Sequence, residues 1–323
     1  MKKNNILILS AGRRVELVQA FKTELAQLIP LSRVIAVDLN PNLSAACQAA
    51  DEHYKAPNVT SDKYIPFLKK LCIEKSVSMV IPTIDSELLV LSTSREYFKS
   101  FGVNLIISEV SLVKACRNKN QLTKIFHEMR LDTPLIFKKD DLSFPCFVKP
   151  YDGSSSNGTH ALIDKSMLSD NILNNEKNMF MELIPSYYDE YTIDVYYDRK
   201  GKLKSFVPRL RIETRSGEVS KGVTKNNFIY EHLLNKLPNL IGARGCITLQ
   251  MLVCEKEDVY KAIEINPRFG GGYPLSYSAG ANYPRMLIRE YFLDEQIDFS
   301  NDWEINLLML RYDSKILLND YKS

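Results

Sequence analysis

The sequence predicts an α/β domain with a parallel sheet, followed by an α+β region built on antiparallel strands. Over roughly the first hundred residues, short apolar segments alternate with segments of helical spacing, as in a parallel sheet with crossover helices. From residue 147 onward, strand-like segments are separated by glycines and short polar turns, which indicates hairpins. At 323 residues the chain is long enough for two or three packed units.

The first unit is expected to alternate strands and helices in chain order. Residues 6–9 form an apolar run, and residues 15–27 follow with helical spacing. The pattern repeats with strands expected at 34–37, 79–81 and 104–107 and with helices expected at 64–74 and 87–101. This order predicts a doubly wound sheet, whose ligand crevice would lie at the carboxyl ends of the strands.

The same unit has one feature of a dinucleotide site. Asp38 ends the second strand, after a glycine turn, where a ribose-binding acid would stand. However, residues 10–14 contain one glycine, Gly12, where the dinucleotide fingerprint requires three. A dinucleotide-dependent oxidoreductase is therefore disfavoured, and we interpret this unit as a scaffold that contributes part of a substrate site.

A helix is expected at 119–129, and two hairpins are expected further along the chain. Strands at 189–197 and 203–212 flank the turn 198–201, and strands at 247–253 and 259–265 flank the turn 254–258. If the second hairpin closes symmetrically about Glu257, Gln250 lies directly opposite Glu264.

Residues 263–268 are the most informative for chemistry. Glu264 and Asn266 are two residues apart on a strand and so share a face, which Gln250 joins from across the hairpin. One carboxylate and two amide oxygens suit Mg2+, which completes its octahedron with water and phosphate oxygens. Arg268 follows on the same face if the strand continues. A solvated polar sheet face explains these residues equally well when they are taken alone.

Residues 147–159 indicate a phosphate-binding segment. Lys149 closes an apolar strand, and the loop after it consists of Gly153, Ser154, Ser155, Ser156, Asn157 and Gly158. Small side chains allow backbone N–H groups to approach phosphate oxygens, and Lys149 adds a positive charge. The lysine precedes the loop, so the Walker A spacing does not apply, and a surface glycine-serine turn is the alternative.

Residues 179–185 read as an apolar strand that ends at the acid Glu182, followed by the start of a connector. Such a connector can present its backbone to the edge of an adenine while an acid accepts hydrogen bonds from ribose hydroxyls. A plain core strand is the alternative.

The composition disfavours several other classes of protein. The chain is 45% hydrophobic and 25% charged, and no apolar run approaches the ~20 residues that span a bilayer. The basic N-terminus lacks a cleavage site, so we expect a cytoplasmic protein without membrane association. The net charge is +3 without a long basic tract, so nucleic acid is not an expected partner. The six cysteines and four histidines are scattered, which argues against a zinc site.

The order of these segments resembles the ATP-grasp superfamily. It runs from Lys119 to Lys149 and its loop, then through residues 181–184, Glu190 and Gln250 to the motif Glu264-x-Asn266-x-Arg268. The chain is most similar to carbamoyl phosphate synthetase large-chain-like single-unit proteins. The resemblance implies a Rossmann-like pre-ATP-grasp domain at 1–115, followed by a two-lobed ATP-grasp domain with a small lobe at 116–185 and a large lobe with the metal site at 186–323.

The resemblance also implies a role for each matching residue. Lys119 and Lys149 would hold the α- and β-phosphates, and the loop 153–158 would close over the β- and γ-phosphates. The adenine would be lined by Glu182, Leu183 and Ile184, and the ribose would be bound by Glu190. One or two Mg2+ ions, or Mn2+ in their place, would be held by Gln250, Glu264 and Asn266, while Arg268 would stabilise the transferred phosphoryl group. Because Pro185 has no N–H, a neighbour such as Ile184 must supply the donor to the adenine.

The function implied by the resemblance is that of an ATP- and Mg2+-dependent carboxylate–amine ligase, with Arg268, Lys149 and Glu264 as its catalytic residues. It would form ADP through an acyl phosphate and act on a small-molecule carboxylate and an amine, and a homodimer is compatible with it. The alternative is an ATP-binding carbamoyl phosphate synthetase-like subunit that serves a partner. With one ATP-grasp unit and no glutamine-hydrolysing motif, synthesis of carbamoyl phosphate alone is not expected. A basic stretch either faces an anionic substrate or lies on a solvated strand edge; it comprises Arg209, Arg211, Arg215 and Lys221.

Overall fold

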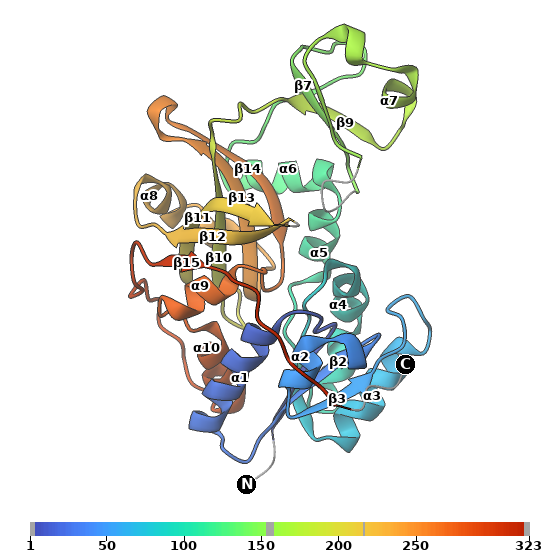
Figure 1. Ribbon diagram of the computed structural model, residues 1–323, viewed down its shortest axis with the longest axis vertical. Coiled ribbons are helices and arrows are strands. Elements are labelled where there is room, and N and C mark those ends of the chain that lie inside the picture. Colours follow the sequence, from blue (N-terminus) through green and yellow to red (C-terminus); the bar gives the residue numbers. More distant parts are fainter. Residues whose placement is uncertain (1–3, 153–157, 216, 320–323) are drawn as a thin grey trace.

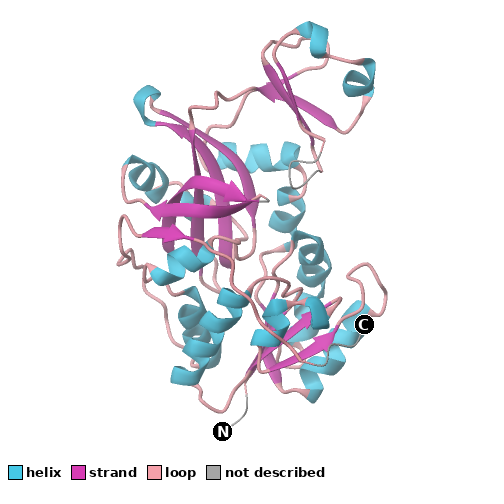
Figure 2. Ribbon diagram, in the orientation of Figure 1, coloured by secondary structure: helices cyan, strands magenta, loops and turns pink. Residues whose placement is uncertain are grey.

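The computed structural model describes residues 4–152, 158–215 and 217–319, which fold around three β-sheets (Figures 1 and 2). The first is a five-stranded parallel sheet in the order β3-β2-β1-β4-β5. Its strands are β1 (Asn5–Ile8), β2 (Val34–Asp38), β3 (Glu52–Lys55), β4 (Val77–Ile81) and β5 (Asn104–Leu105). The helices in this part of the chain are α1 (Val15–Leu28), η1 (Pro41–Leu43), α2 (Ala45–Ala49), α3 (Tyr64–Glu74), α4 (Asp85–Lys99) and α5 (Val110–Cys116). The next helix, α6 (Lys119–Glu128), packs against α5 and against the strand Val259–Asn266 (β14) of the second sheet.

Strand β1 shows why this part of the chain forms a parallel sheet. All four of its residues are buried, as expected for a strand covered on both faces. Alternate side chains enter different cores: Ile6 and Ile8 pack on one side of the sheet, and Leu7 and Leu9 on the other. The predicted α/β class is confirmed. The edge strand β3 was not expected, because its polar sequence lacks an apolar run.

The second sheet has six strands in the order β14-β13-β10-β11-β12-β15, paired antiparallel. These strands are β10 (Asp189–Tyr197), β11 (Leu203–Arg215), β12 (Glu218–Thr224), β13 (Gly245–Cys254), β14 (Val259–Asn266) and β15 (Leu308–Leu310). The remaining helices are α8 (Phe228–Leu234), η3 (Leu237–Asn239), η4 (Glu255–Glu257), α9 (Tyr273–Ser278) and α10 (Tyr283–Phe292). Both predicted hairpins are present.

The hairpin of β13 and β14 has the predicted pair but a different closure. Gln250 lies opposite Glu264, as expected. The turn is not symmetric about Glu257, however, because Cys254 pairs with Val259 and Met251 with Ala262. A register shift beyond Met251 leaves Ile263 without a partner residue, and this β-bulge brings Gln250 and Glu264 into register.

The third sheet belongs to a small lobe that stands apart at the top of Figure 1. It has the order β6-β9-β7-β8, with β6 (Ile136–Phe137), β7 (Cys146–Pro150), β8 (His160–Leu162) and β9 (Asn178–Glu182), and it carries η2 (Lys165–Met167) and α7 (Asp170–Asn174). Among the described residues, its fully buried apolar cluster consists of Cys146, Val148, Leu162 and Phe180. The lobe therefore has a small core of its own.

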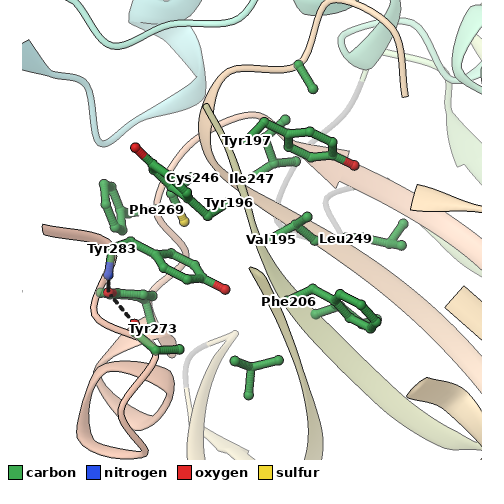
Figure 3. Packing of buried hydrophobic residues seen from close by; sticks show 14 of the residues in the cluster. Val195, Tyr196, Tyr197, Phe206, Cys246, Ile247, Leu249, Phe269, Tyr273 and Tyr283 are labelled. Carbon is green, nitrogen blue, oxygen red and sulfur yellow. Dashed lines mark hydrogen bonds between the residues drawn. The ribbon is translucent and has the colours of Figure 1, made fainter. Parts of the chain in front are cut away.

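By contrast, the first and second sheets share one core. A single cluster of buried residues runs from α1 and β1 to the second sheet and α10, and α1 packs against α10. Figure 3 shows part of this cluster, in which the ring of Tyr283 lies beside those of Tyr273 and Tyr196. The Tyr283 backbone N–H donates to the Tyr273 hydroxyl at 2.8 Å, which fixes the start of α10. These two parts therefore form one packed body.

The three sheets lie within residues 5–105, 136–182 and 189–310, so the boundaries that we propose at residues 115 and 185 fall between them.

In the part of the chain that the structure describes, no helix has both the length and the apolar character needed to cross a membrane.

Candidate active site

One face of the second sheet brings together the three predicted metal ligands. Two rows of paired residues cross the strands: Thr192, Gln250 and Glu264 form one row, and Asp194, Thr248 and Asn266 form the next. Residues of neighbouring rows that are two apart on a strand share a face, so Gln250, Glu264 and Asn266 lie on the same face. All three are partly buried. The arrangement matches the sequence prediction, and their role as ligands stays a prediction.

Two lysines from different elements face the same cleft. Lys119 begins α6 and Lys149 lies on β7, and both line a narrow cleft whose walls include Met179 and Met181 of the small lobe and Ile263 of β14. The opening is apolar on its sides and positive at the lysines. Such a cleft can accept a flat apolar ring together with phosphate groups.

Electrostatics show that these lysines lie within reach of Glu264. Burial and, after it, the charge of Lys119 lower the pKa of Lys149 to about 8, against the opposing effect of Glu264. The pKa of Lys119 is also lowered by burial, while Glu264 and Asp152 raise it. The structure therefore brings Lys119, Lys149 and Glu264 together from three elements.

The residues expected near adenine and ribose have defined partners. Glu182 ends β9, accepts a hydrogen bond from the Leu135 N–H at 3.1 Å, and lies 3.5 Å from the Lys261 ammonium. Leu183 and Ile184 follow it, partly buried, in the connection to β10. Glu190 forms an ion pair with Arg211. In this structure the expected ribose acid is thus held by an arginine, and its binding role stays a prediction.

Of the predicted phosphate loop, residues 153–158, the structure describes Gly158. Residues 153–157, which include Gly153, Ser154, Ser155, Ser156 and Asn157, lie outside the described residues. Gly158 has a φ of +71°, in the left-handed region that favours glycine, and a Cβ there would lie 3.2 Å from Pro150 Cγ.

Arg268 connects the second sheet to the part of the chain around the first sheet, which we call the first domain. Its Nε and Nη2 donate to the two carboxylate oxygens of Asp85 at 3.0 and 2.6 Å, and its Nη1 donates to the Phe269 carbonyl at 3.1 Å. Asp85 is the first residue of α4. No local sequence pattern could signal this pairing, because the two residues are 183 positions apart.

The basic stretch of β11 and β12 is paired with carboxylates rather than solvated throughout. Arg209 is buried and donates to Asp194 at 2.8 Å, and the Arg211 guanidinium contacts Glu190. Further along, Arg215 pairs with Asp313, and Lys221 pairs with Glu213 at 2.7 Å. Only the outer pairs fit the expected solvated strand edge.

Asp38 has a structural role that removes the main support for a dinucleotide site. Its Oδ2 accepts the Gly12 N–H at 2.9 Å, and its Oδ1 accepts the Asn40 N–H at 3.0 Å. Both carboxylate oxygens therefore stabilise backbone turns at the carboxyl ends of β1 and β2.

A second hollow lies between the second sheet and the first domain, the unit that was expected to contribute part of a substrate site. It has a volume of about 160 Å3 and is bordered by residues 10–14 on one side and by Glu218, Gly270, Gly271 and Arg311 on the other.

Two family models match the sequence. One is described as a PylC-like N-terminal domain and matches residues 6–106. The other is described as ATP-grasp in the biosynthetic pathway with Ter operon and matches residues 174–307. No curated protein matches the sequence.

Several solved structures have the same fold. The biotin carboxylase domain dimer of Hydrogenobacter thermophilus 2-oxoglutarate carboxylase, in complex with MgADP and bicarbonate, has a TM-score of 0.74 and 16% identity over 95% of this chain and 74% of that chain. N5-carboxyaminoimidazole synthetase from Staphylococcus aureus, complexed with ADP, has a TM-score of 0.71 and 13% identity over 94% and 81% of the two chains. For L-amino acid ligase from Bacillus licheniformis the values are 0.67 and 15%, over 90% and 74%.

At these identities the likeness to solved structures shows the fold. The fold, the two family models and the order of the motifs agree with one another, and the superfamily predicted from the sequence is confirmed. Within this chain, residues 6–106 therefore form a PylC-like N-terminal domain, and residues 174–307 form part of an ATP-grasp domain.

Proposed function

We propose that this protein is an ATP- and Mg2+-dependent ligase that joins a carboxylate to an amine and releases ADP and phosphate. The observation that carries the proposal is that Lys119 and Lys149 line one cleft close to Glu264, which shares a sheet face with Gln250 and Asn266. Among the proteins of the same fold, the biotin carboxylase domain was solved with MgADP and the S. aureus synthetase with ADP.

The two lysines fit a polyphosphate. Lys119 and Lys149 are close enough for the charge of Lys119 to lower the pKa of Lys149, and burial lowers the pKa of both. Polyphosphate would place further negative charge beside these two ammonium groups and favour their charged forms.

The metal ligands proposed on the sheet face fit Mg2+. They comprise one carboxylate, Glu264, and the amide oxygens of Gln250 and Asn266. Mg2+ prefers oxygen ligands and usually takes only a few of them from the protein, because phosphates and water complete its coordination. Within the described residues, no group of three His, Cys, Asp or Glu side chains offers another metal site. When bound, the ion neutralises charge on the phosphates.

The residues present support phosphoryl transfer to a carboxylate. A carboxylate oxygen of the substrate attacks the γ-phosphorus, and the bond from that phosphorus to the β,γ-bridging oxygen breaks to release ADP. The positive charges of Lys149 and Arg268 compensate the charge on the transferring group. The amine then attacks the acyl carbon, the bond to the phosphate oxygen breaks, and the amine loses a proton. The products are an amide, phosphate and ADP.

The proposal also covers the substrates and the assembly. We take the acid and the amine to be small molecules, the location to be the cytoplasm, and the oligomer to be a homodimer, by analogy with the Hydrogenobacter domain dimer. Light scattering of the purified protein tests the last point: a mass near 37.0 kDa would contradict a dimer.

The activity is tested by measuring ADP release with a panel of carboxylates and amines in the presence of ATP and Mg2+. Hydroxylamine should intercept the acyl phosphate and yield a hydroxamate only when ATP, Mg2+ and the correct acid are all present. Phosphate release that does not depend on any acid would favour simple ATP hydrolysis. Nucleotide binding without ADP release for any pair would favour a subunit that serves a partner.

A further inference from the structure

The ion pair between Arg268 and Asp85 has the geometry of an orienting contact. The Nε and Nη2 of Arg268 donate to the two oxygens of one carboxylate, at 3.0 and 2.6 Å. Two parallel hydrogen bonds fix the plane of a guanidinium, whereas a single contact would leave it free to turn. Arg268 is the arginine whose charge we propose to act on the transferring phosphoryl group. Asp85 therefore sets the direction in which that charge is presented.

The second sheet fixes the backbone of the same arginine. The Arg268 N–H donates to the Asn266 carbonyl at 2.8 Å, and the Thr248 hydroxyl donates to the Arg268 carbonyl at 3.1 Å. Thr248 and Asn266 are paired across β13 and β14, and Asn266 is one of the proposed metal ligands. The sheet thus holds the backbone of Arg268 next to the metal site, while Asp85 of the first domain holds the end of its side chain.

Asp85 is itself held in a well-defined turn. It is the first residue of α4, where the helix N-terminus stabilises a negative charge. The buried carboxylate of Glu87 accepts hydrogen bonds from the Thr83 and Ile84 N–H groups at 2.7 and 3.2 Å, and it also accepts from two side-chain hydroxyls. These contacts fix the turn that leads into Asp85. The carboxylate is therefore preorganised to receive the guanidinium.

The pair lies beside the proposed metal site. Burial raises the pKa of the Cys116 thiol, and the charges of Asp85 and Glu264 raise it further, so both carboxylates are near this one side chain. Helix α5, which ends at Cys116, also contacts β14, the strand of Glu264. Through Asp85, the first domain therefore reaches the place where phosphoryl transfer is proposed.

The exposure of the pair argues against a mainly structural role. The Asp85 side chain is 44% exposed, and an ion pair this open to water contributes little to stability. Cohesion between the first domain and the second sheet comes from their shared core. A second pair between the same two parts, Arg244 with Glu109 at 3.0 Å, has a carboxylate that is 43% exposed. It offers a matched comparison, because its arginine precedes β13 and has no proposed role in the reaction.

We propose that Asp85 is a positioning residue for phosphoryl transfer, because it holds the Arg268 guanidinium in the orientation that stabilises the transferring group. This inference rests on the proposed function, since it adds a residue of the first domain to the same reaction. The nucleotide is held by the two lysines and the metal ligands, and none of these contacts Asp85 directly in the proposed arrangement. Loss of the carboxylate should therefore impair transfer and leave nucleotide affinity intact.

Asp85→Asn is the first test. Asparagine keeps the size of the side chain but replaces one acceptor oxygen with an NH2 group, which cannot receive the guanidinium fork. With an acid and an amine that support turnover, kcat for ADP release should fall by about thirtyfold or more, while KM for ATP changes by less than about twofold. Asp85→Glu restores a carboxylate and should recover at least about threefold of the lost kcat.

Glu109→Gln is the control, since it removes the matched ion pair and should retain kcat. A fall in kcat as large as that of Asp85→Asn would mean that any contact between the two parts matters, and it would overturn the assignment. Wild-type kcat in Asp85→Asn, or a rise in KM for ATP as large as the loss of kcat, would also overturn it. So would an Asp85→Asn protein that does not fold, because the pair would then be structural.

A double-mutant cycle tests whether Asp85 acts through Arg268. Arg268→Lys keeps the charge but cannot form the fork, so Asp85→Asn in that background should lower kcat by less than about twofold more. The alternative is an effect through Arg14: burial and then the charge of Arg268 lower the pKa of Arg14, whereas Asp85 raises it. Losses that multiply in the double variant would favour that alternative and overturn the inference.

MgADP with aluminium fluoride separates this inference from the proposed function. Aluminium fluoride mimics the transferring phosphoryl group and should tighten the binding of MgADP to the wild-type protein, and Asp85→Asn should reduce that gain by at least about tenfold without changing the affinity for MgADP alone. If the wild-type protein shows no gain, the inference fails. If ADP is released with an acid and an amine but Asp85→Asn has no effect, the inference fails and the ligase stands. If no acid and amine support ADP release but the gain depends on Asp85, the inference stands and the ligase fails.

Discussion

Lys149 illustrates how the cleft sets the charge of a single side chain. Burial, followed by the charge of Lys119, lowers its pKa to about 8 in the nucleotide-free protein. Phosphates would favour the charged form and raise this pKa. Below pH 8 the lysine is already protonated, so the affinity for ADP should change little there. Above pH 8 binding must take up a proton, and the affinity should fall by up to about tenfold per pH unit.

Titration calorimetry of MgADP binding at pH 7 and pH 9, in buffers with different ionisation enthalpies, checks both the affinity and the proton uptake. Lys149→Arg is the matched variant, because arginine stays charged over this range, and its pH dependence should be much weaker. Equal affinities at the two pH values in the wild-type protein would contradict a lysine poised near pH 8.

Glu264 is the only carboxylate in the proposed metal site. Glu264→Gln keeps the shape of the side chain and its place opposite Gln250 but removes the charge. We expect Mg2+-dependent ADP release to fall by about a hundredfold or more, while the unfolding temperature stays nearly the same. Glu255→Gln, at the exposed tip of the same hairpin, is the control and should retain activity. Near-normal turnover of Glu264→Gln would rule out the metal assignment.

At the scale of elements, the hairpin of β13 and β14 shows what strand periodicity can predict. Alternate residues of a strand share a face, and this rule correctly predicted that Glu264 and Asn266 lie on one face, because no bulge separates them. The assumption that the turn is symmetric about Glu257 predicted the correct pair, Gln250 and Glu264, only because two deviations cancel. Near the turn the strands pair one residue out of the symmetric register, and the bulge at Ile263 restores it. A bulge depends on the hydrogen bonds of the partner strand, which leave no local pattern in the sequence.

The small lobe makes an element-scale prediction, because its core is small. Phe180 is 1% exposed and packs with Cys146, Val148 and Leu162, the other fully buried members of this cluster. Truncation of a buried phenylalanine costs about 3–5 kcal/mol, a large loss for so small a core. Phe180→Ala should therefore unfold the lobe locally, abolish MgADP binding, and leave the main thermal transition in place.

Limited proteolysis followed by mass spectrometry checks this prediction, since new cleavage sites should appear between residues 136 and 182. Ile163→Ala is the control within the same lobe, because its side chain is exposed and its loss should not open the lobe. A single cooperative transition at a much lower temperature, without selective cleavage, would mean that the lobe is not an independent folding unit.

At the scale of the whole molecule, the order of motifs was predictable and the contacts between domains were not. Lys119, Lys149 and Glu264 could be assigned to one site because the family fixes their order along the chain. The pairs Arg268–Asp85 and Arg311–Glu16 join residues 183 and 295 positions apart, and no periodicity relates them. The sequence indicated that the first unit contributes part of a substrate site, but the residues that close the hollow around Arg14 from the second sheet follow from tertiary packing.

The packing divides the described part of the molecule into two bodies with separate cores. The first domain and the second sheet share a continuous core, and Glu24 of α1 accepts hydrogen bonds from Tyr277 and Arg285, each at 2.9 Å. The small lobe stands apart and contributes Lys149, Met179 and Met181 to the cleft. A nucleotide in this cleft would contact both bodies, so its binding should restrain the lobe without altering the shared core.

Hydrogen exchange with and without a non-hydrolysable ATP analogue and Mg2+ tests this division. Amides of β7, β8 and β9 should exchange about tenfold more slowly in the complex, because nucleotide binding suppresses opening of the lobe. Amides of α1 and α10 should be unchanged. Lys149→Met provides the control, since it should show no protection at the same nucleotide concentration. Equal protection of α1, α10 and the lobe would indicate one rigid body, and unchanged exchange in a protein shown to be saturated would exclude closure of the lobe over the nucleotide.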